Sequence, residues 1–106
     1  MQRYPVRATH RRNLEGTSLA GILQAHFEGV VADGDSVTAR WGAIERLTAR
    51  GEGRELQIDL SMNPKVPEAV ARETIARYNR FLEEATGYSA KERARRARKP
   101  ASGPGD

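Results

Sequence analysis

The chain has 106 residues and a formal net charge of +4, and its length suits one domain with a modest hydrophobic core. It contains no cysteine, which excludes a disulfide framework, a thiolate metal site and a cysteine nucleophile. No segment resembles a secretory signal or approaches the roughly 18 apolar residues of a membrane-spanning helix. The composition therefore predicts a cytoplasmic protein with no membrane partner.

The first quarter of the chain is predicted to hold a short strand, a polar connection and an amphipathic helix. Residues 3–8 suit a strand, and Pro5 restricts it to the edge of a sheet because proline has no N–H to donate. A polar connection follows. A helix capped by Thr17 or Ser18 then runs to Gly29. Its apolar stripe, which includes one histidine, consists of Leu19, Ile22, Leu23, His26 and Phe27.

The middle of the chain has the alternating pattern of an antiparallel sheet. The predicted strands are 30–32, 37–41, 43–50 and 56–62, and the turns between them are 33–36 and 51–53. Ile44 and Leu47 break the alternation of the third run, which indicates a bulge nearby. The last run alternates most regularly. One face of this sheet is therefore expected to be buried and the other exposed to water.

A second and longer helix is predicted to begin at Pro67, because proline fits the first helical position, and to end at Gly87. Glu73 and Arg77 are expected to form an i,i+4 ion pair. One apolar stripe follows the helix, through Val70, Thr74, Tyr78, Phe81, Leu82 and Ala85. The order (β)-α-β-β-β-β-α predicts the α+β class: a two-layer sandwich in which two helices cover one face of an antiparallel meander of three to five strands.

The positive charge of the chain is concentrated at its C-terminal end. Residues 1–87 contain 12 Lys or Arg and 12 Asp or Glu, whereas residues 88–106 contain 6 and 2. Ser89 and Glu92 form a capping-box pattern that predicts a new short helix, with Ala90, Ala94 and Ala97 on one face and Glu92 paired with Arg96. The predicted organisation is a single domain over 1–87, a basic helical arm over 88–99 and a disordered tail over 100–106.

The leading functional hypothesis is a non-enzymatic module whose basic arm contacts the phosphates of RNA or DNA. The candidate binding residues are the cations of the arm and of the loop after the first strand: Lys91, Arg93, Arg95, Arg96, Arg98, Lys99, Arg11 and Arg12. The alternative is a protein-interaction domain, in which the alanine face of the terminal helix docks on a partner or on a second copy. The least favoured hypothesis is an enzyme or a small-ligand domain.

Other polar residues give no chemical site from their spacing. His10 lies in a basic loop, and His26 is expected to be partly buried with its hydrogen bonds satisfied. The run Asp33-Gly34-Asp35 lacks the further ligands of a calcium loop and is predicted to be a hairpin turn. The sequence contains no nucleophile elbow, Gly-rich phosphate loop or H-E-x-x-H motif. Catalytic residues, cofactors and metal ligands are therefore not predicted.

The run from Asn79 to Arg93 resembles the C-terminal pattern N-x-F-L-x-E-A-T-G-x-x-A-K-x-R of a small archaeal family of unknown function. The resemblance is close over about 15 residues and looser over most of the chain. It implies a two-layer α/β sandwich, which agrees with the fold predicted from the residues. The family has no established activity, so the resemblance implies no catalytic residue.

Overall fold

The computed structural model describes residues 2–98, with side chains described as far as Arg95. Five strands, two longer helices and two shorter helical segments follow one another along the chain. In order they are β1 (Gln2–Pro5), the 3-10 segment η1 (Ala8–Leu14), α1 (Gly16–His26), β2 (Glu28–Asp33), β3 (Ser36–Trp41), β4 (Ile44–Glu52), β5 (Glu55–Met62), α2 (Glu68–Thr86) and α3 (Ala90–Arg98).

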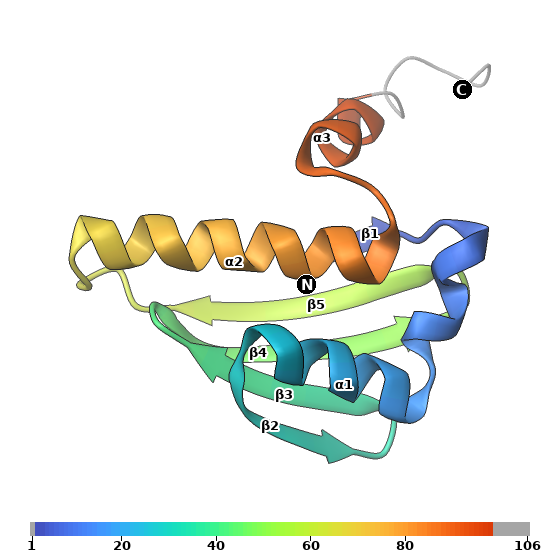
Figure 1. The fold of residues 1–106 in the computed structure, drawn as a ribbon, viewed down its shortest axis with the longest axis horizontal. Helices are drawn as coiled ribbons and strands as arrows, with labels where there is room; N and C mark the ends of the chain where they lie inside the picture. The colour runs from blue at the N-terminus through green and yellow to red at the C-terminus, as the bar shows by residue number, and fades with distance from the viewer. Residues whose placement is uncertain (1, 99–106) are drawn as a thin grey trace.

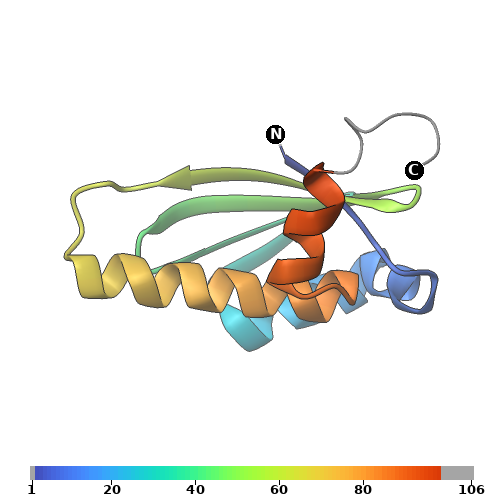
Figure 2. The ribbon, with the colours of Figure 1, turned by 90° about the horizontal axis from the view of Figure 1, so that it is seen from above.

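The strands form one antiparallel sheet in the order β1-β5-β4-β3-β2, and α1 and α2 lie side by side on one of its faces (Figures 1 and 2). The predicted α+β sandwich is confirmed. Strands β2 to β5 form the predicted meander. Strand β1, at the start of the chain, pairs with β5, which follows it only after three other strands. The edge position of β1 is also confirmed. It suits Pro5, which has no N–H to donate to a neighbouring strand.

The hydrophobic core fills the space between the sheet and the two helices. Phe27 follows α1 and Phe81 belongs to α2, and their rings meet edge to face with centroids 5.3 Å apart. The strands contribute alternate side chains, and the fully buried ones of greatest volume are Leu47, Leu56 and Ile58. The opposite face of the sheet carries mainly polar side chains such as Thr38 and Arg50. This division is the one that the alternation predicts.

The boundaries of α1 differ from the prediction. The helix begins at Gly16 with Glu15 at the N-cap position, so Thr17 and Ser18 lie in the first turn and do not cap it. It ends at His26 because Phe27 turns to an extended conformation. Gly29, the predicted helix end, has φ 61° within β2, beside the register shift between Glu28 and Val31. The polar connection predicted before α1 forms the 3-10 segment η1.

Four local predictions about the later elements have different outcomes. Gly51 belongs to β4, and not to a turn, because it pairs in register with Leu56 of β5. Leu14 also packs closely on it, since a Cβ there would lie 2.5 Å from Leu14 Cβ. Arg77 does not pair with Glu73; it donates to the carbonyl of His26 at 2.8 Å and stacks 4.3 Å from the centroid of Trp41. The predicted bulge in β4 is confirmed by the register shift after Ile44. Pro67 precedes α2 as its N-cap.

Thr74 links α2 to the β3–β4 turn through a buried hydroxyl. The backbone N–H of Ala43 donates to Thr74 Oγ1 at 3.0 Å, and that hydroxyl donates to the carbonyl of Val70 at 2.7 Å. Gly42 allows this approach, because it has φ 54° and a Cβ there would lie 2.5 Å from Thr74 Oγ1. The hydroxyl is therefore fully used inside the protein.

Replacing Thr74 with valine keeps the shape of the side chain but leaves the buried N–H of Ala43 without its acceptor. Urea unfolding should show a loss of about 1–3 kcal/mol in the free energy of unfolding. Thr48→Val on the polar face of the sheet is the matched control and should change stability by less than about 0.5 kcal/mol. Equal effects of the two substitutions would contradict the buried link.

Candidate nucleic-acid interface

The turn between α2 and α3 is closed by Gly87 in the left-handed conformation. Gly87 has φ 80°, and its N–H donates to the carbonyl of Glu83 at 2.8 Å, which ends α2 as the sequence predicts. The hydroxyl of Thr86 accepts from the N–H of Tyr88 at 3.1 Å. A Cβ on Gly87 would lie 2.7 Å from Nδ1 of His10, so η1 also packs against this glycine. The joint therefore depends on glycine for both conformation and space.

The predicted capping box is present at the start of α3. The N–H of Ser89 donates to Glu92 Oε1 at 2.9 Å, and the N–H of Glu92 donates to Ser89 Oγ at 3.2 Å. The two side chains thus satisfy backbone donors that the first turn of a helix leaves without partners. This begins α3 in the residue after Ser89.

Arg93 is the residue that fixes α3 to the domain. Only 9% of it is exposed. Its guanidinium donates to the carbonyl of Tyr88 at 2.6 Å and to Asn79 Oδ1 on α2 at 3.0 Å. Burial lowers the pKa of Arg93, partly offset by the nearby Tyr4 and Tyr78. One of the predicted phosphate ligands is therefore used internally, as the anchor of the helix.

Two tyrosines extend this polar cluster to strand β1. The hydroxyl oxygens of Tyr4 and Tyr78 lie 3.2 Å apart and share a hydrogen bond, and Tyr4 also donates to Gln2 Oε1. Burial of Tyr78, reinforced by the hydrogen bond with Tyr4, raises the pKa of Tyr78 well above its ordinary value. The cluster joins β1, α2 and α3, which explains why α3 stands at the β1 edge of the sandwich (Figures 1 and 2).

Arg7, between β1 and η1, closes the joint from the other side. Its Nε donates to the carbonyl of Gly87 at 2.8 Å, and Nη2 forms an ion pair with Glu92 at 2.8 Å. Its guanidinium carbon also lies 4.4 Å from the centroid of the Tyr88 ring. Glu92 is thus paired with Arg7, and the side chain of Arg96, its predicted partner, lies outside the described side chains. Like Arg93, Arg7 holds the arm in place.

Four of the predicted phosphate ligands have exposed side chains in the structure, two on α3 and two on η1. Lys91 and Arg95 are exposed on α3, one helical turn apart, and Arg11 and Arg12 are exposed on η1. None of these four takes part in an ion pair within the described residues. Of the remaining predicted ligands, Arg96 and Arg98 belong to α3 by their backbone, and Lys99 lies outside the described residues.

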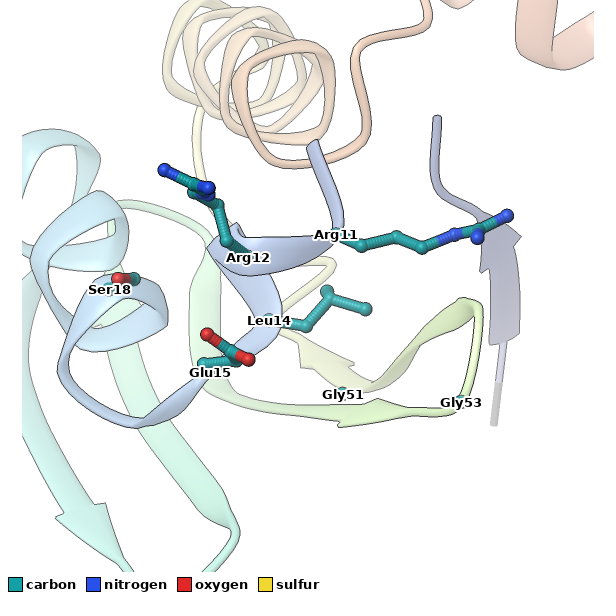
Figure 3. A pocket seen from close by; sticks show the side chains of 7 residues that line it. All are labelled: Arg11, Arg12, Leu14, Glu15, Ser18, Gly51 and Gly53. Atoms are coloured by element: carbon teal, nitrogen blue, oxygen red, sulfur yellow. The ribbon is translucent and has the colours of Figure 1, made fainter. Parts of the chain in front are cut away.

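Arg11 and Arg12 line an open depression between η1, α1 and the β4–β5 hairpin. Its volume is about 630 Å³, and it is lined by Arg11, Arg12, Leu14, Glu15, Ser18, Gly51 and Gly53. Figure 3 shows that the two arginines point away from each other, Arg11 toward β1 and Arg12 toward α1. Since α3 stands at the β1 edge, the structure places Arg11 on the side of α3 and directs Arg12 away from it.

The other candidate residues have structural roles. Nε2 of His26 lies 2.7 Å from Glu84 Oε1, so the prediction of a partly buried and satisfied histidine is confirmed. Gly34 and Asp35 form the β2–β3 turn, as predicted. Within residues 2–98 no group of three or more His, Cys, Asp or Glu side chains is arranged to hold a metal ion. No helix in this part of the chain is long and apolar enough to cross a membrane.

The family model of DUF5611, a domain of unknown function, matches residues 1–99. The chain belongs to this family. Among solved structures it is similar to the NMR solution structure of the hypothetical protein TA0095 from Thermoplasma acidophilum, with 26% identity and a TM-score of 0.68. The match covers 92% of this chain and 97% of that one. A comparison with curated proteins finds no significant match. The resemblance to an uncharacterised archaeal family is therefore confirmed.

In this DUF5611 member, the C-terminal run that carries the resemblance coincides with the joint between α2 and α3. Asn79 accepts from Arg93, Phe81 and Ala85 are buried in the core, and Gly87 makes the left-handed turn. Both Asn79 and Arg93 belong to the pattern that carries the resemblance. Their hydrogen bond could not be predicted from the pattern, because it forms only when the turn at Gly87 brings α3 back against α2. The role of Arg7 had no local signal, because its partners are 80 or more residues away.

Arg93→Met should release α3 while keeping an apolar stem of similar length. The substitution removes hydrogen bonds made by a charged donor, so we expect a loss of about 1.5–3 kcal/mol in the free energy of unfolding. Faster amide exchange in α3 should accompany the loss. Arg95→Met changes the charge of the same helix equally at an exposed position and should cost less than about 0.5 kcal/mol. Similar results for both would argue against the anchor.

The capping box should open at low pH. The hydrogen bond from the N–H of Ser89, helped by the Arg7 charge, lowers the pKa of Glu92 below its ordinary value. A carboxyl group with a lowered pKa in the folded state stabilises the fold at pH values above the ordinary carboxyl pKa. This contribution disappears as the pH falls through the lowered pKa. NMR titration of the Glu92 carboxyl carbon and of the Ser89 amide should give one common midpoint. Arg7→Ala should move that midpoint upward, and an unchanged midpoint would contradict the pairing.

Proposed function

We propose that this DUF5611 domain is a non-enzymatic module that binds nucleic acid through phosphate contacts made by α3 and η1. The observation that supports it best is the way α3 is held. Its buried side carries Arg93 and its capping box is closed, while Lys91 and Arg95 remain exposed to solvent. A docked helix presents cations at a constant spacing and loses less conformational entropy on binding than a flexible tail does.

The distribution of charge favours a polyanion as the partner. The first 87 residues are balanced, with 12 Lys or Arg against 12 Asp or Glu, so the excess of +4 belongs to the segment that contains α3. Each phosphate that a cation neutralises releases condensed counterions, which favours binding at low salt. A cytoplasmic location, favoured by the absence of cysteine, is part of the same proposal.

The aromatic residues near α3 favour contacts with phosphates over stacking on bases. Tyr4 and Tyr78 are half-buried and hydrogen bonded to each other, and Tyr88 is buried beneath the guanidinium of Arg7. Stacking of single-stranded bases requires exposed ring faces, which these tyrosines do not offer. Phosphate contacts carry no base information by themselves. The proposed binding is therefore largely independent of sequence.

The η1 segment extends the proposed surface at one position. Arg11 points toward the β1 edge, where α3 stands, so a nucleic-acid backbone crossing α3 could reach it (Figure 3). Arg12 points toward α1, and Arg93 is buried. Within the described side chains, Lys91, Arg95 and Arg11 are thus the proposed phosphate ligands. We expect Arg12 to contribute less than Arg11.

The alternative is a protein-interaction role through the alanine face of α3, and one observation favours it. Ala90 and Ala94 are exposed and do not dock on the domain itself. A partner helix could cover them. This role requires no polyanion, so it predicts binding that responds little to salt and to the removal of Lys91 and Arg95.

The test is fluorescence anisotropy with short RNA and DNA duplexes and single strands over a range of salt. The double variant Lys91→Ala and Arg95→Ala should bind about tenfold more weakly, and its salt slope should be shallower by about 0.9 for each B-DNA phosphate that it no longer neutralises. The control variant Lys65→Ala and Arg46→Ala has the same charge change at exposed positions away from α3. Absence of binding at low salt, or equal weakening in both variants, would refute the proposal.

A further inference from the structure

We propose that two copies of the chain associate through strand β2, edge to edge, to form a continuous antiparallel sheet. The two edges of the sheet differ. At one edge β1 is four residues long, contains Pro5 and lies beside α3. At the other edge β2 is six residues long, and the run Val30-Val31-Ala32 carries no charge. An uncovered edge presents unpaired N–H and C=O groups to a further strand.

The register of the β2–β3 hairpin shows which backbone groups of β2 are open. Asp33 pairs with Ser36 and Val31 pairs with Thr38 across a two-residue turn. A turn of this kind is closed by a hydrogen-bonded pair, and such pairs recur at every second residue. The peptide groups of Asp33 and Val31 therefore face β3. The N–H and C=O of Ala32 and the C=O of Val30 face outward, where a second strand can pair with them. The N–H of Val30 lies within the register shift after Glu28.

The side chains of β2 favour a second copy of the same strand. Val31 is 59% exposed on the face of the sheet away from the helices, a high exposure for a large apolar residue. In antiparallel pairing about a two-fold axis at Val31, the N–H of Ala32 in each copy would donate to the carbonyl of Val30 in the other. The two Val31 residues would then lie opposite each other as a non-hydrogen-bonded pair, in which the Cα atoms are about 4.5 Å apart and the side chains are close. Their exposed surfaces would cover one another.

Charge and space also agree with this register. Asp33 of one copy would lie opposite Gly29 of the other, where no side chain obstructs it. Arg40 extends across Gly29, since its Nε would lie 3.1 Å from a Cβ at that position. The carboxylate of Asp33 would therefore meet the Arg40 guanidinium of the other copy. Glu28 would lie opposite Gly34, so the register places no two acidic residues directly opposite each other.

The proposed dimer leaves the nucleic-acid surface free. The β2 edge and α3 lie on opposite sides of the sheet (Figure 1), so each end of the dimer would carry one basic helix. Two linked sites would bind a long polyanion more tightly than one site does. The proposal of a dimer does not depend on nucleic-acid binding, and the experiments that test it use the protein alone.

The first experiment is analytical ultracentrifugation of the full chain from micromolar to millimolar concentration. The edge contact is small, so we expect a weak monomer–dimer equilibrium. Val31→Lys should weaken it by at least about tenfold, because a charge would replace the central apolar pair. Ile75→Lys, on the exposed side of α2, is the control and should leave the equilibrium unchanged. Circular dichroism checks that both variants are folded.

A second measurement follows the backbone itself. The amide proton of Ala32 should exchange rapidly in the dilute protein and become protected as the concentration rises. The amide of Val31, which faces β3, should be protected throughout. A chain that stays monomeric at every concentration, or a dimer that persists in Val31→Lys, would overturn the proposal. Exchange of the Ala32 amide that does not respond to concentration would do the same.

Charge reversal tests the register. Asp33→Lys alone should weaken the dimer, and combining it with Arg40→Glu should restore much of the affinity by inverting the pair between the copies. Within one chain Arg40 pairs in register with Glu28 and Asp33 with Ser36, so the rescue cannot come from a contact inside one copy. Because Arg40→Glu would also place a second acid opposite Glu28 in the same copy, both charge variants carry Glu28→Gln. Failure of the charge-reversed chain to recover would then rule out the pairing about Val31.

Discussion

Covering the apolar face of the sheet is the constraint on which the rest of the structure depends. Alternate side chains of the strands, such as Leu47, Leu56 and Ile58, are buried away from solvent. Burial of each one stabilises the folded state by roughly 1.5–3 kcal/mol. Neither helix covers the sheet alone, so α1 and α2 lie side by side and meet at Phe27 and Phe81. Their placement then brings the end of α2 beside η1 and the β1 edge.

The joint after α2 determines which charges of the arm remain available. A buried guanidinium must find acceptors, and Arg93 finds them in the Tyr88 carbonyl and Asn79 once Gly87 has turned the chain. Arg7 is more exposed, but it too is held within the protein, by the carbonyl of Gly87 and the carboxylate of Glu92. The cations thus divide into those that hold α3 and those that α3 and η1 present to solvent. A count of arginines does not distinguish these groups.

The two edges of the sheet differ in ways that support the two proposals. The β1 edge is short, interrupted by proline and bordered by a basic helix, features that discourage strand pairing and favour an anion. The β2 edge lacks a covering element among the described residues and has an exposed valine in its centre. Because the edges lie on opposite sides of the sheet, occupancy of one does not obstruct the other.

The sequence by itself determined the elements whose cause is local. Residue alternation predicted the strands, the apolar stripe predicted α2, and Ser89 with Glu92 predicted the start of α3, because these signals act within a few residues. Gly87 ended α2 as predicted for the same reason. Tertiary structure decided what depends on distant segments: the pairing of β1 with β5, the contact of Leu14 with Gly51, and the partners of Arg77. It also decided that Arg93 is buried while Lys91 and Arg95 are not, since that difference arises only where α3 meets α2 and β1.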